Sequence, residues 1–88
     1  EDPSYELIQI YIEDAETIEG EFLSGKDLFF KLSSLAEGHR IKFHYSNVLS
    51  LTAKLRHLWK GIQTKFDCLI KKERNYIQYC FKQKKNSS

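Results

Sequence analysis

The side chains best suited to chemistry lie in the stretch 46–63, SNVLSLTAKLRHLWKGIQ. If this stretch is a helix, its apolar face comprises Val48, Leu51, Thr52, Leu55, Leu58, Trp59 and Ile62. The opposite face is small and neutral in its first half and basic in its second half, a shape and charge suited to the major groove of DNA. An ordinary amphipathic helix with a solvated face has the same pattern. The helix alone leaves both interpretations open.

A second cluster of cations lies in the stretch 65–85, where apolar and polar residues alternate at the period of a β-strand. With Arg74 and Asn75 at a turn, paired residues have numbers that sum to 149. Shifting the pairing by one residue would mix apolar and polar side chains, so burial is expected to fix this register. One face then carries Phe66, Cys68, Ile70, Ile77, Tyr79 and Phe81.

The same register has three further consequences. Cys68 points inward and Cys80 outward, so the two cysteines are not expected to form a disulfide. Asn75 tolerates the positive φ that tight hairpins require. The tip and exit of the hairpin are densely basic, and such cations suit solubility or phosphate contacts; they are Lys71, Lys72, Arg74, Lys82, Lys84 and Lys85.

Enzymatic and metal chemistry are not indicated by the motifs. The two cysteines and the three histidines lack the C-x-x-C or H-x-x-x-H spacing of a zinc site. The sequence also has no Gly-rich phosphate loop, no nucleophile elbow and no pair of carboxylates in the setting that acid-base catalysis requires. We therefore expect no enzyme activity, no metal and no cofactor.

Composition indicates one folded domain. The 88 residues are 41% hydrophobic and 14% aromatic, which excludes a disordered chain. No apolar run approaches the ~20 residues that span a bilayer, and no segment resembles a signal peptide, so a cytoplasmic protein without membrane contacts is expected. Because the chain lacks Met and begins EDPS, we expect residues 1–88 to be a single domain excised from a longer protein, with flexible tails at 1–3 and 84–88.

Charge is segregated along the chain although the net charge is only +2. Residues 1–21 carry eight acids and no base, giving −8, whereas residues 22–88 carry fourteen bases and four acids, giving +10. Charges that only solvate a surface are expected to be mixed along the chain. The segregation favours a polyanionic partner on one side of the molecule.

Three helices are expected before the hairpin. Asp2 and Pro3 are typical of a helix start, and the run 5–16 fits a helix better than a strand because of its length, although Ile8, Ile10 and Ile12 also alternate. A short extended connection is expected at 19–23.

The second helix is expected to begin after Ser24 as N-cap, with Asp27 completing a capping box, and to stop at a left-handed Gly38. An extended linker at 39–45 leads to Ser46, which is expected to cap the third helix, and Gly61 is expected near the end of that helix.

This order of elements resembles that of winged helix-turn-helix DNA-binding domains over nearly the whole chain, in element order and charge placement. The resemblance implies an α+β fold of three helices plus a C-terminal β-hairpin wing. Residues 25–37 would be the supporting helix, 47–60 the recognition helix and 66–82 the wing. The connection from His39 to Ser46 is longer than the tight turn of a simple helix-turn-helix, which leaves the crossing angle of the two helices open.

More narrowly, the segments LSGKDLFFKL, SNVLSLTAKLRHLW and KKERNY resemble the winged-helix domains of replication initiator helicases and primases of phages and staphylococcal mobile elements. Abundant Lys, Ile, Phe and Tyr fit a low-GC bacterial genome. The resemblance implies a role in DNA replication, the sequence-specific recognition of an origin by the initiator of a mobile genetic element.

By this resemblance, double-stranded DNA is the partner, together with other copies of the protein or the rest of its parent protein. Helix 47–60 would enter the major groove and the wing would contact the backbone or minor groove. If about five phosphates are neutralised, log affinity should fall against log salt with a slope of about −4 to −5. The expected DNA-binding residues are Asn47, Ser50, Lys54, Arg56, His57, Lys60, Lys71, Lys72, Arg74 and Asn75, with the C-terminal lysines adding backbone contacts.

Two requirements and one alternative accompany this interpretation. Lys54 and Arg56 must lie on the same side as Lys71 and Arg74, and the acidic leading segment must lie away from them. Without such a common side, no surface would remain for a double helix. The alternative is a winged helix that binds protein, in which the acidic first helix or the face around Tyr76 docks another subunit. RNA binding is less favoured, because the paired exposed aromatics of a stacking sheet are missing.

Overall fold

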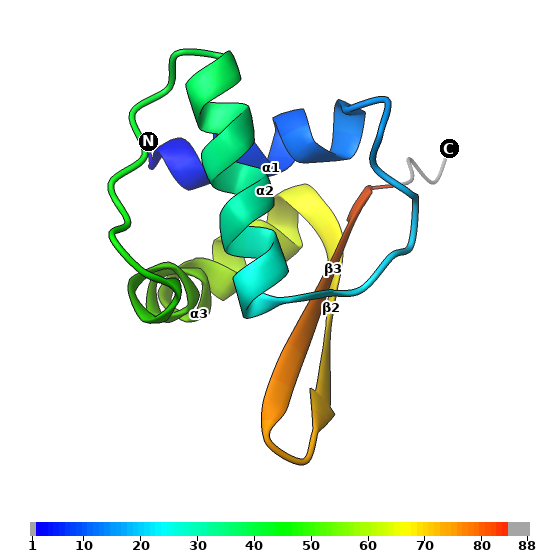
Figure 1. The fold of residues 1–88 in the computed structure, drawn as a ribbon. Coiled ribbons are helices and arrows are strands. Elements are labelled where there is room, and N and C mark those ends of the chain that lie inside the picture. The colour runs from blue at the N-terminus through cyan, green and yellow to red at the C-terminus, as the bar shows by residue number, and fades with distance from the viewer. Residues whose placement is uncertain (1, 85–88) are drawn as a thin grey trace.

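Three helices form the body of the molecule, and a β-hairpin projects from it, in the computed structural model, which describes residues 2–84 (Figure 1). In chain order the elements are α1 (Pro3–Glu13), β1 (Leu23–Ser24), α2 (Gly25–Gly38), α3 (Val48–Lys65), β2 (Phe66–Glu73) and β3 (Tyr76–Gln83). The strands form one antiparallel sheet of order β1-β3-β2. The expected α+β class, with three helices and a C-terminal hairpin, is confirmed and is compatible with a winged helix.

The first segment is a helix, not a strand. Asp2 caps it, with Oδ1 accepting a hydrogen bond from the Ser4 backbone N–H at 2.8 Å, and Pro3 occupies its first position. The buried residues recur at the helical period of 3.6 rather than at every second position; they are Ser4, Leu7, Ile8 and Tyr11. Of the tail expected at 1–3, Asp2 and Pro3 form the start of α1, whereas residue 1 lies outside the described residues.

Ser24 caps α2 as expected, because its Oγ accepts a hydrogen bond from the Asp27 N–H at 3.1 Å. The end of the helix differs from the expectation. Gly38 is the last helical residue, but the left-handed residue is Arg40, with φ 57°. The N–H of Arg40 bonds to the carbonyl of Glu37, and that of Ile41 to the carbonyl of Ala36 at 2.8 Å. This is a Schellman ending in which Arg40 takes the position that glycine usually occupies.

The N-terminus of α3 is capped by Asn47 rather than by Ser46. The Asn47 side chain accepts from the Ser50 N–H at 2.9 Å, and the Ser50 hydroxyl lies against the Asn47 backbone, which completes a capping box. The helix runs four residues past Gly61 to Lys65. Gly61 is needed for packing, because a Cβ there would collide with the hydroxyl of Tyr5 on α1.

The C-terminal end of α3 is tied to the end of the hairpin. Lys84 Nζ donates to the carbonyl oxygens of Gln63 at 3.4 Å and of Thr64 at 3.1 Å. A cation at this position stabilises the unpaired carbonyls of the last turn. Lys84 is the one described residue of the tail expected at 84–88; residues 85–88, including the expected backbone contact Lys85, lie outside the described residues.

The hairpin has the expected register, from Phe66 opposite Gln83 to Glu73 opposite Tyr76, with the turn at Arg74 and Asn75. The turn forms without positive φ at Asn75, since Arg40 is the only non-glycine residue with positive φ within residues 2–84. The tolerance of Asn75 for positive φ is therefore not used in this turn.

A third strand was not expected. β1 pairs with β3, Leu23 opposite Tyr79, so that β3 is the central strand of the sheet. Cys80 on β3 is only 1% exposed, which contradicts its expected outward position. A small side chain on a central strand has neighbours on both edges, which a two-stranded hairpin would not provide. Cys68 and Cys80 are both free thiols.

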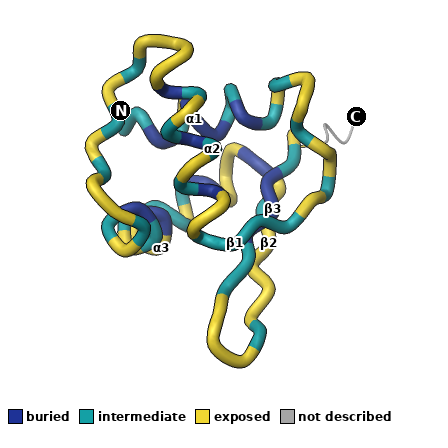
Figure 2. Tube along the Cα trace, viewed as in Figure 1, coloured by how far each residue is buried: buried dark blue, intermediate teal, exposed yellow. Residues whose placement is uncertain are grey.

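One hydrophobic core joins all three helices to the base of the hairpin, and Figure 2 shows the buried residues gathered there, with an exposed hairpin tip. The apolar face expected for the third helix supplies the innermost part. None of the helices within residues 2–84 has the length and apolar character needed to cross a bilayer. The buried members are Leu7, Ile8, Tyr11, Leu28, Leu32, Ala36, Leu51, Leu55, Ile62, Phe66, Tyr79 and Phe81.

Two leucines of α3 provide a matched test of this packing. Leu55 is fully buried and Leu49 is 79% exposed. Replacing Leu55 by Ala should lower the free energy of unfolding by about 2–5 kcal/mol, because it leaves a cavity. Leu49→Ala removes the same atoms from a side chain that is mostly exposed to solvent. It should change the free energy of unfolding by less than about 0.5 kcal/mol. Urea denaturation of both variants measures the difference, and equal losses would contradict the helix orientation described.

Candidate nucleic-acid interface

A groove of about 580 Å³ runs between α3 and the β2–β3 hairpin. Its floor is apolar and is built from the helix and both hairpin strands. Its rim is polar and mostly cationic. The floor consists of Trp59, Ile70, Ile77 and Tyr79, and the rim of Arg56, Lys60, Gln63 and Lys72.

Aromatic packing holds the two walls of this groove together. The Trp59 ring on α3 lies 6.2 Å from the Tyr79 ring and 5.9 Å from the Phe81 ring on β3. Burial raises the pKa of Tyr79, and the nearby positive charge of Arg56 acts in the opposite direction. Arg56 on α3 therefore lies close enough to the groove floor for its charge to act on Tyr79 of the hairpin.

The rim cations are not neutralised by the protein. Within residues 2–84, Arg56, Lys60 and Lys72 form no ion pair with an acidic side chain. A concave surface lined by charges of one sign, with low-dielectric walls, focuses the electric field on an approaching counter-ion. The groove is therefore suited to an anionic ligand.

The exposed side of α3 continues the groove toward the N-terminus of the helix. Leu49, Ala53, Arg56 and Lys60 are spaced at i, i+4, i+7 and i+11, which places them within an arc of about 60°. Leu49 and Ala53 are exposed, as are the two cations. We call these four residues the α3 strip.

Only part of the expected site comes together at the groove. Arg56, Lys60 and Lys72 surround it, whereas Lys71 lies on the opposite face of the hairpin. Lys71 Nζ is 3.5 Å from Glu73 Oε1 and 5.9 Å from the centre of the Phe22 ring. Successive residues of a strand point to opposite faces, so Lys71 and Lys72 cannot act on one surface.

The remaining expected residues are exposed but lie elsewhere. His57 follows Arg56 on the outer surface of α3, and Arg74 and Asn75 form the exposed tip of the hairpin. The capping box of α3 engages the Asn47 Oδ1 and the Ser50 hydroxyl. Of the two residues expected to read bases at the start of the helix, Ser50 is therefore occupied by intrahelical bonds, and Asn47 keeps only its Nδ2 amide for a ligand.

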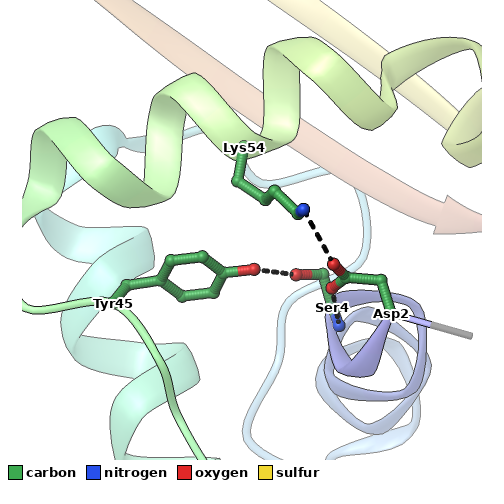
Figure 3. Close-up of polar contacts among 4 residues, drawn as sticks. All are labelled: Asp2, Ser4, Tyr45 and Lys54. Atoms are coloured by element: carbon green, nitrogen blue, oxygen red, sulfur yellow. Dashed lines mark hydrogen bonds and ion pairs between the residues drawn. The ribbon is translucent and has the colours of Figure 1, made fainter.

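Lys54 faces the acidic leading segment, not the groove. Its Nζ is 3.2 Å from Asp2 Oδ2, the carboxylate that also caps α1, and next to it the Ser4 hydroxyl bonds to the Tyr45 hydroxyl at 2.6 Å (Figure 3). The leader was expected to lie away from the basic residues, which is wrong at this position. The stated requirement that Lys54 and Arg56 share a side with Lys71 and Arg74 is thus not met as written.

Other acids of the leader are paired away from the groove. Lys31 on α2 lies 3.1 Å from Asp14 Oδ2 and 3.8 Å from Glu16 Oε2. These pairs hold the leader's carboxylates against α2, so they do not cover Arg56, Lys60 or Lys72. The positive surface is smaller than expected but lies along one side of α3 and the hairpin.

Two features of this surface were missed from the sequence. Leu49 lies outside the apolar face of the predicted helix, a signal that was present but not used. The apolar floor of the groove was not expected either, since Trp59, Ile77 and Tyr79 were assigned only to the core. Trp59 and Ile77 are partly exposed, whereas Tyr79 is only 5% exposed, and their position in the groove depends on the angle between α3 and the hairpin.

The cysteines and histidines do not add chemistry to the site. Burial, with smaller contributions from Asp67 and Cys80, raises the pKa of Cys68 to about 11, so its thiol stays protonated at neutral pH. Burial also raises the pKa of Cys80. In the part of the chain from 2 to 84, no three His, Cys, Asp or Glu side chains cluster as metal ligands would.

Comparison with known proteins does not identify the chain. A scan against models of protein families, a search of curated proteins and a search of solved structures each found no match. The assignment of the site therefore depends on the geometry and chemistry described above.

Variants of Asp2 separate its cap from its ion pair. Asp2→Ala should lower the free energy of unfolding by about 1 kcal/mol through loss of the cap. Asp2→Asn keeps the cap and loses only the pair with Lys54, which at the partial exposure of Lys54 contributes less than about 0.5 kcal/mol.

The pH dependence gives a second measurement of the same pair. Burial acts to raise the pKa of Asp2, but its hydrogen bonds to Ser4 and its pairing with Lys54 outweigh this and lower it below 3.8. The stabilisation is therefore complete above the ordinary pKa and is lost as the pH falls through the lowered value. Urea denaturation in this acid range should show the free energy of unfolding of the wild type falling toward that of Asp2→Asn. A difference in free energy between the two proteins that does not vary with pH would contradict the ion pair.

Proposed function

We propose that the chain is a winged helix-turn-helix domain that binds double-stranded DNA sequence-specifically, with α3 in the major groove and the hairpin as the wing. The observation that carries the proposal is the convergence on one groove, between helix and hairpin, of three cations that form no ion pair within residues 2–84: Arg56, Lys60 and Lys72. The order of elements, three helices followed by a C-terminal hairpin, is that of the winged helix-turn-helix domains that the sequence resembles.

The dimensions of the parts support this arrangement. A helix with its side chains is about 10–12 Å across and fits a major groove about 12 Å wide. The hairpin extends beyond the helical body and leaves α3 accessible beside it (Figure 1). A duplex lying along the α3 strip would meet Lys72 and the tip residue Arg74 at its backbone.

The ion pairs of Lys54 with Asp2 and of Lys71 with Glu73 lower the expected electrostatic contribution to DNA binding. Among the expected DNA-binding residues, the lysines and arginines without an ion pair within residues 2–84 are Arg56, Lys60, Lys72 and Arg74. Neutralising four phosphates gives a slope of log affinity against log salt of about −3 to −4 rather than −4 to −5. Binding by one such module is weak, and several copies joined through a parent protein would strengthen it by avidity.

Matched double variants test the proposal. Arg56→Gln with Lys60→Gln removes one Arg and one Lys from the groove, and should weaken binding to a duplex of mixed sequence by about tenfold or more and reduce the salt slope by about 2. Arg40→Gln with Lys42→Gln removes the same charges from the exposed end of α2 and the linker after it, and should change neither.

Fluorescence anisotropy titrations over a range of salt concentrations provide the measurement. Equal losses in the two double variants would show that only net charge matters, which contradicts a defined interface. If the unmutated domain does not bind duplex DNA at low salt, the proposed function is wrong.

Origin recognition by the initiator of a mobile element is the biological role we propose for this binding. It is supported by the resemblance of the sequence to initiator domains. Footprinting of the domain on the DNA surrounding its own gene tests it. A discrete protected site in that region is expected, and uniform protection at all concentrations would contradict the role.

A protein-binding winged helix is the second candidate, favoured by exposed apolar residues on the face of the hairpin away from the groove. Leu69 is 52% exposed and Tyr76 is 56% exposed there. An interface of this kind would show association that is insensitive to salt and is lost on Tyr76→Ala. Duplex binding that survives Tyr76→Ala and falls with salt favours the first candidate.

A further inference from the structure

An exposed leucine opens the α3 strip. Leu49, in the first turn of α3, is 79% exposed, the largest exposed fraction among the large hydrophobic residues of the described chain. Ala53, one turn later, is also exposed and lies on the same side. Arg56 and Lys60 follow along the same line toward the hairpin. The strip is therefore apolar over its first two turns and cationic over the next two.

Most polar groups near Leu49 are engaged within the protein. Asn47 and Ser50 bond to each other's backbone in the capping box. Lys54 is paired with Asp2 on the side of α3 that faces α1. The α3 strip therefore presents methyl groups over its first two turns, with the Asn47 Nδ2 amide as the hydrogen-bond donor beside it.

One group on the major-groove edge of DNA matches such a surface. Thymine carries a C5-methyl group there, while the other base edges present hydrogen-bond donors and acceptors. We infer that Leu49, with Ala53 beside it, reads thymine methyl groups, and that the DNA site has thymine at one or two positions facing the first two turns of α3. This inference rests on the proposed function and identifies the bases that α3 prefers.

The neighbours of Leu49 favour DNA over a protein partner. The cores of protein interfaces are depleted of charged residues. The α3 strip instead continues directly into Arg56 and Lys60, which carry no ion pair within residues 2–84, and then into the groove with Lys72. A short apolar patch followed by unpaired cations is complementary to thymine methyls flanked by phosphates.

The test begins with selection of bound duplexes from a randomised library, using the unmutated domain. Single thymines of the selected site are then replaced by deoxyuridine, which lacks only the methyl group. Loss of one buried methyl should weaken binding about fourfold at one or two positions. On the unsubstituted site, Leu49→Ala should weaken binding by a similar factor.

The decisive result is the coupling between the two changes. In Leu49→Ala, deoxyuridine at the sensitive position should cause no further loss, because its contact is already absent. Ile18→Ala is the matched control, since Ile18 is 65% exposed and lies in the connection between α1 and β1. This variant should keep both the affinity and the full sensitivity to deoxyuridine.

The contrary outcomes separate the inference from the function on which it rests. Salt-sensitive binding to a selected site without sensitivity to deoxyuridine, or with sensitivity that Leu49→Ala retains, would overturn the inference and leave the proposed function intact. Salt-sensitive duplex binding without any selected site would overturn both the inference and the sequence specificity. Absence of duplex binding at low salt would overturn both.

Discussion

The junction between α3 and β2 is the constraint on which the rest of the structure depends. The helix ends at Lys65 and the strand begins at Phe66, with no loop between them. The Phe66 N–H bonds to the carbonyl of Ile62, and both side chains are buried. Because the two residues are held in the core, the direction in which the hairpin leaves α3 is set by packing. The groove exists as a result of that angle.

Aromatic contacts near the junction hold α3 and β3, the two sides of the groove, in a fixed relative position. Trp59 packs against Tyr79 and Phe81 on β3, and Tyr11 meets the Phe81 ring edge-on at 6.4 Å. Helix and hairpin thus share one rigid base, while the tip is exposed. A surface made of two elements can present charge in a defined geometry only if those elements are fixed relative to each other.

Pairing within the molecule decides which cations remain available. In the acidic leading segment, Asp2 forms an ion pair with Lys54 and Asp14 forms one with Lys31. In the hairpin, Glu73 pairs with Lys71. Such exposed pairs contribute little to stability. Their larger effect is on the surface, because they remove positive charge from the other sides of α3 and the hairpin. Scattered exposed leucines are ordinary in proteins, and Leu49 becomes informative through its position beside the cations that are left.

Local interactions made much of the fold predictable from the sequence. The cap by Asp2, the cap by Ser24, the apolar face of α3 and the register of the hairpin each depend on residues close together in the chain. Helical period, strand alternation and capping chemistry are short-range effects, so the sequence alone determines them.

Long-range contacts decided what the sequence alone left open. The pairing of β1 with β3, the burial of Cys80 and the ion pair of Lys54 with Asp2 join segments far apart in the chain. Which segments meet in these contacts depends on how the three helices pack, and the periodicity of the sequence does not contain that information. The site was predictable only in part for the same reason: residue types indicated a basic helix and a basic hairpin, but only the tertiary structure selects which of their cations face the same groove.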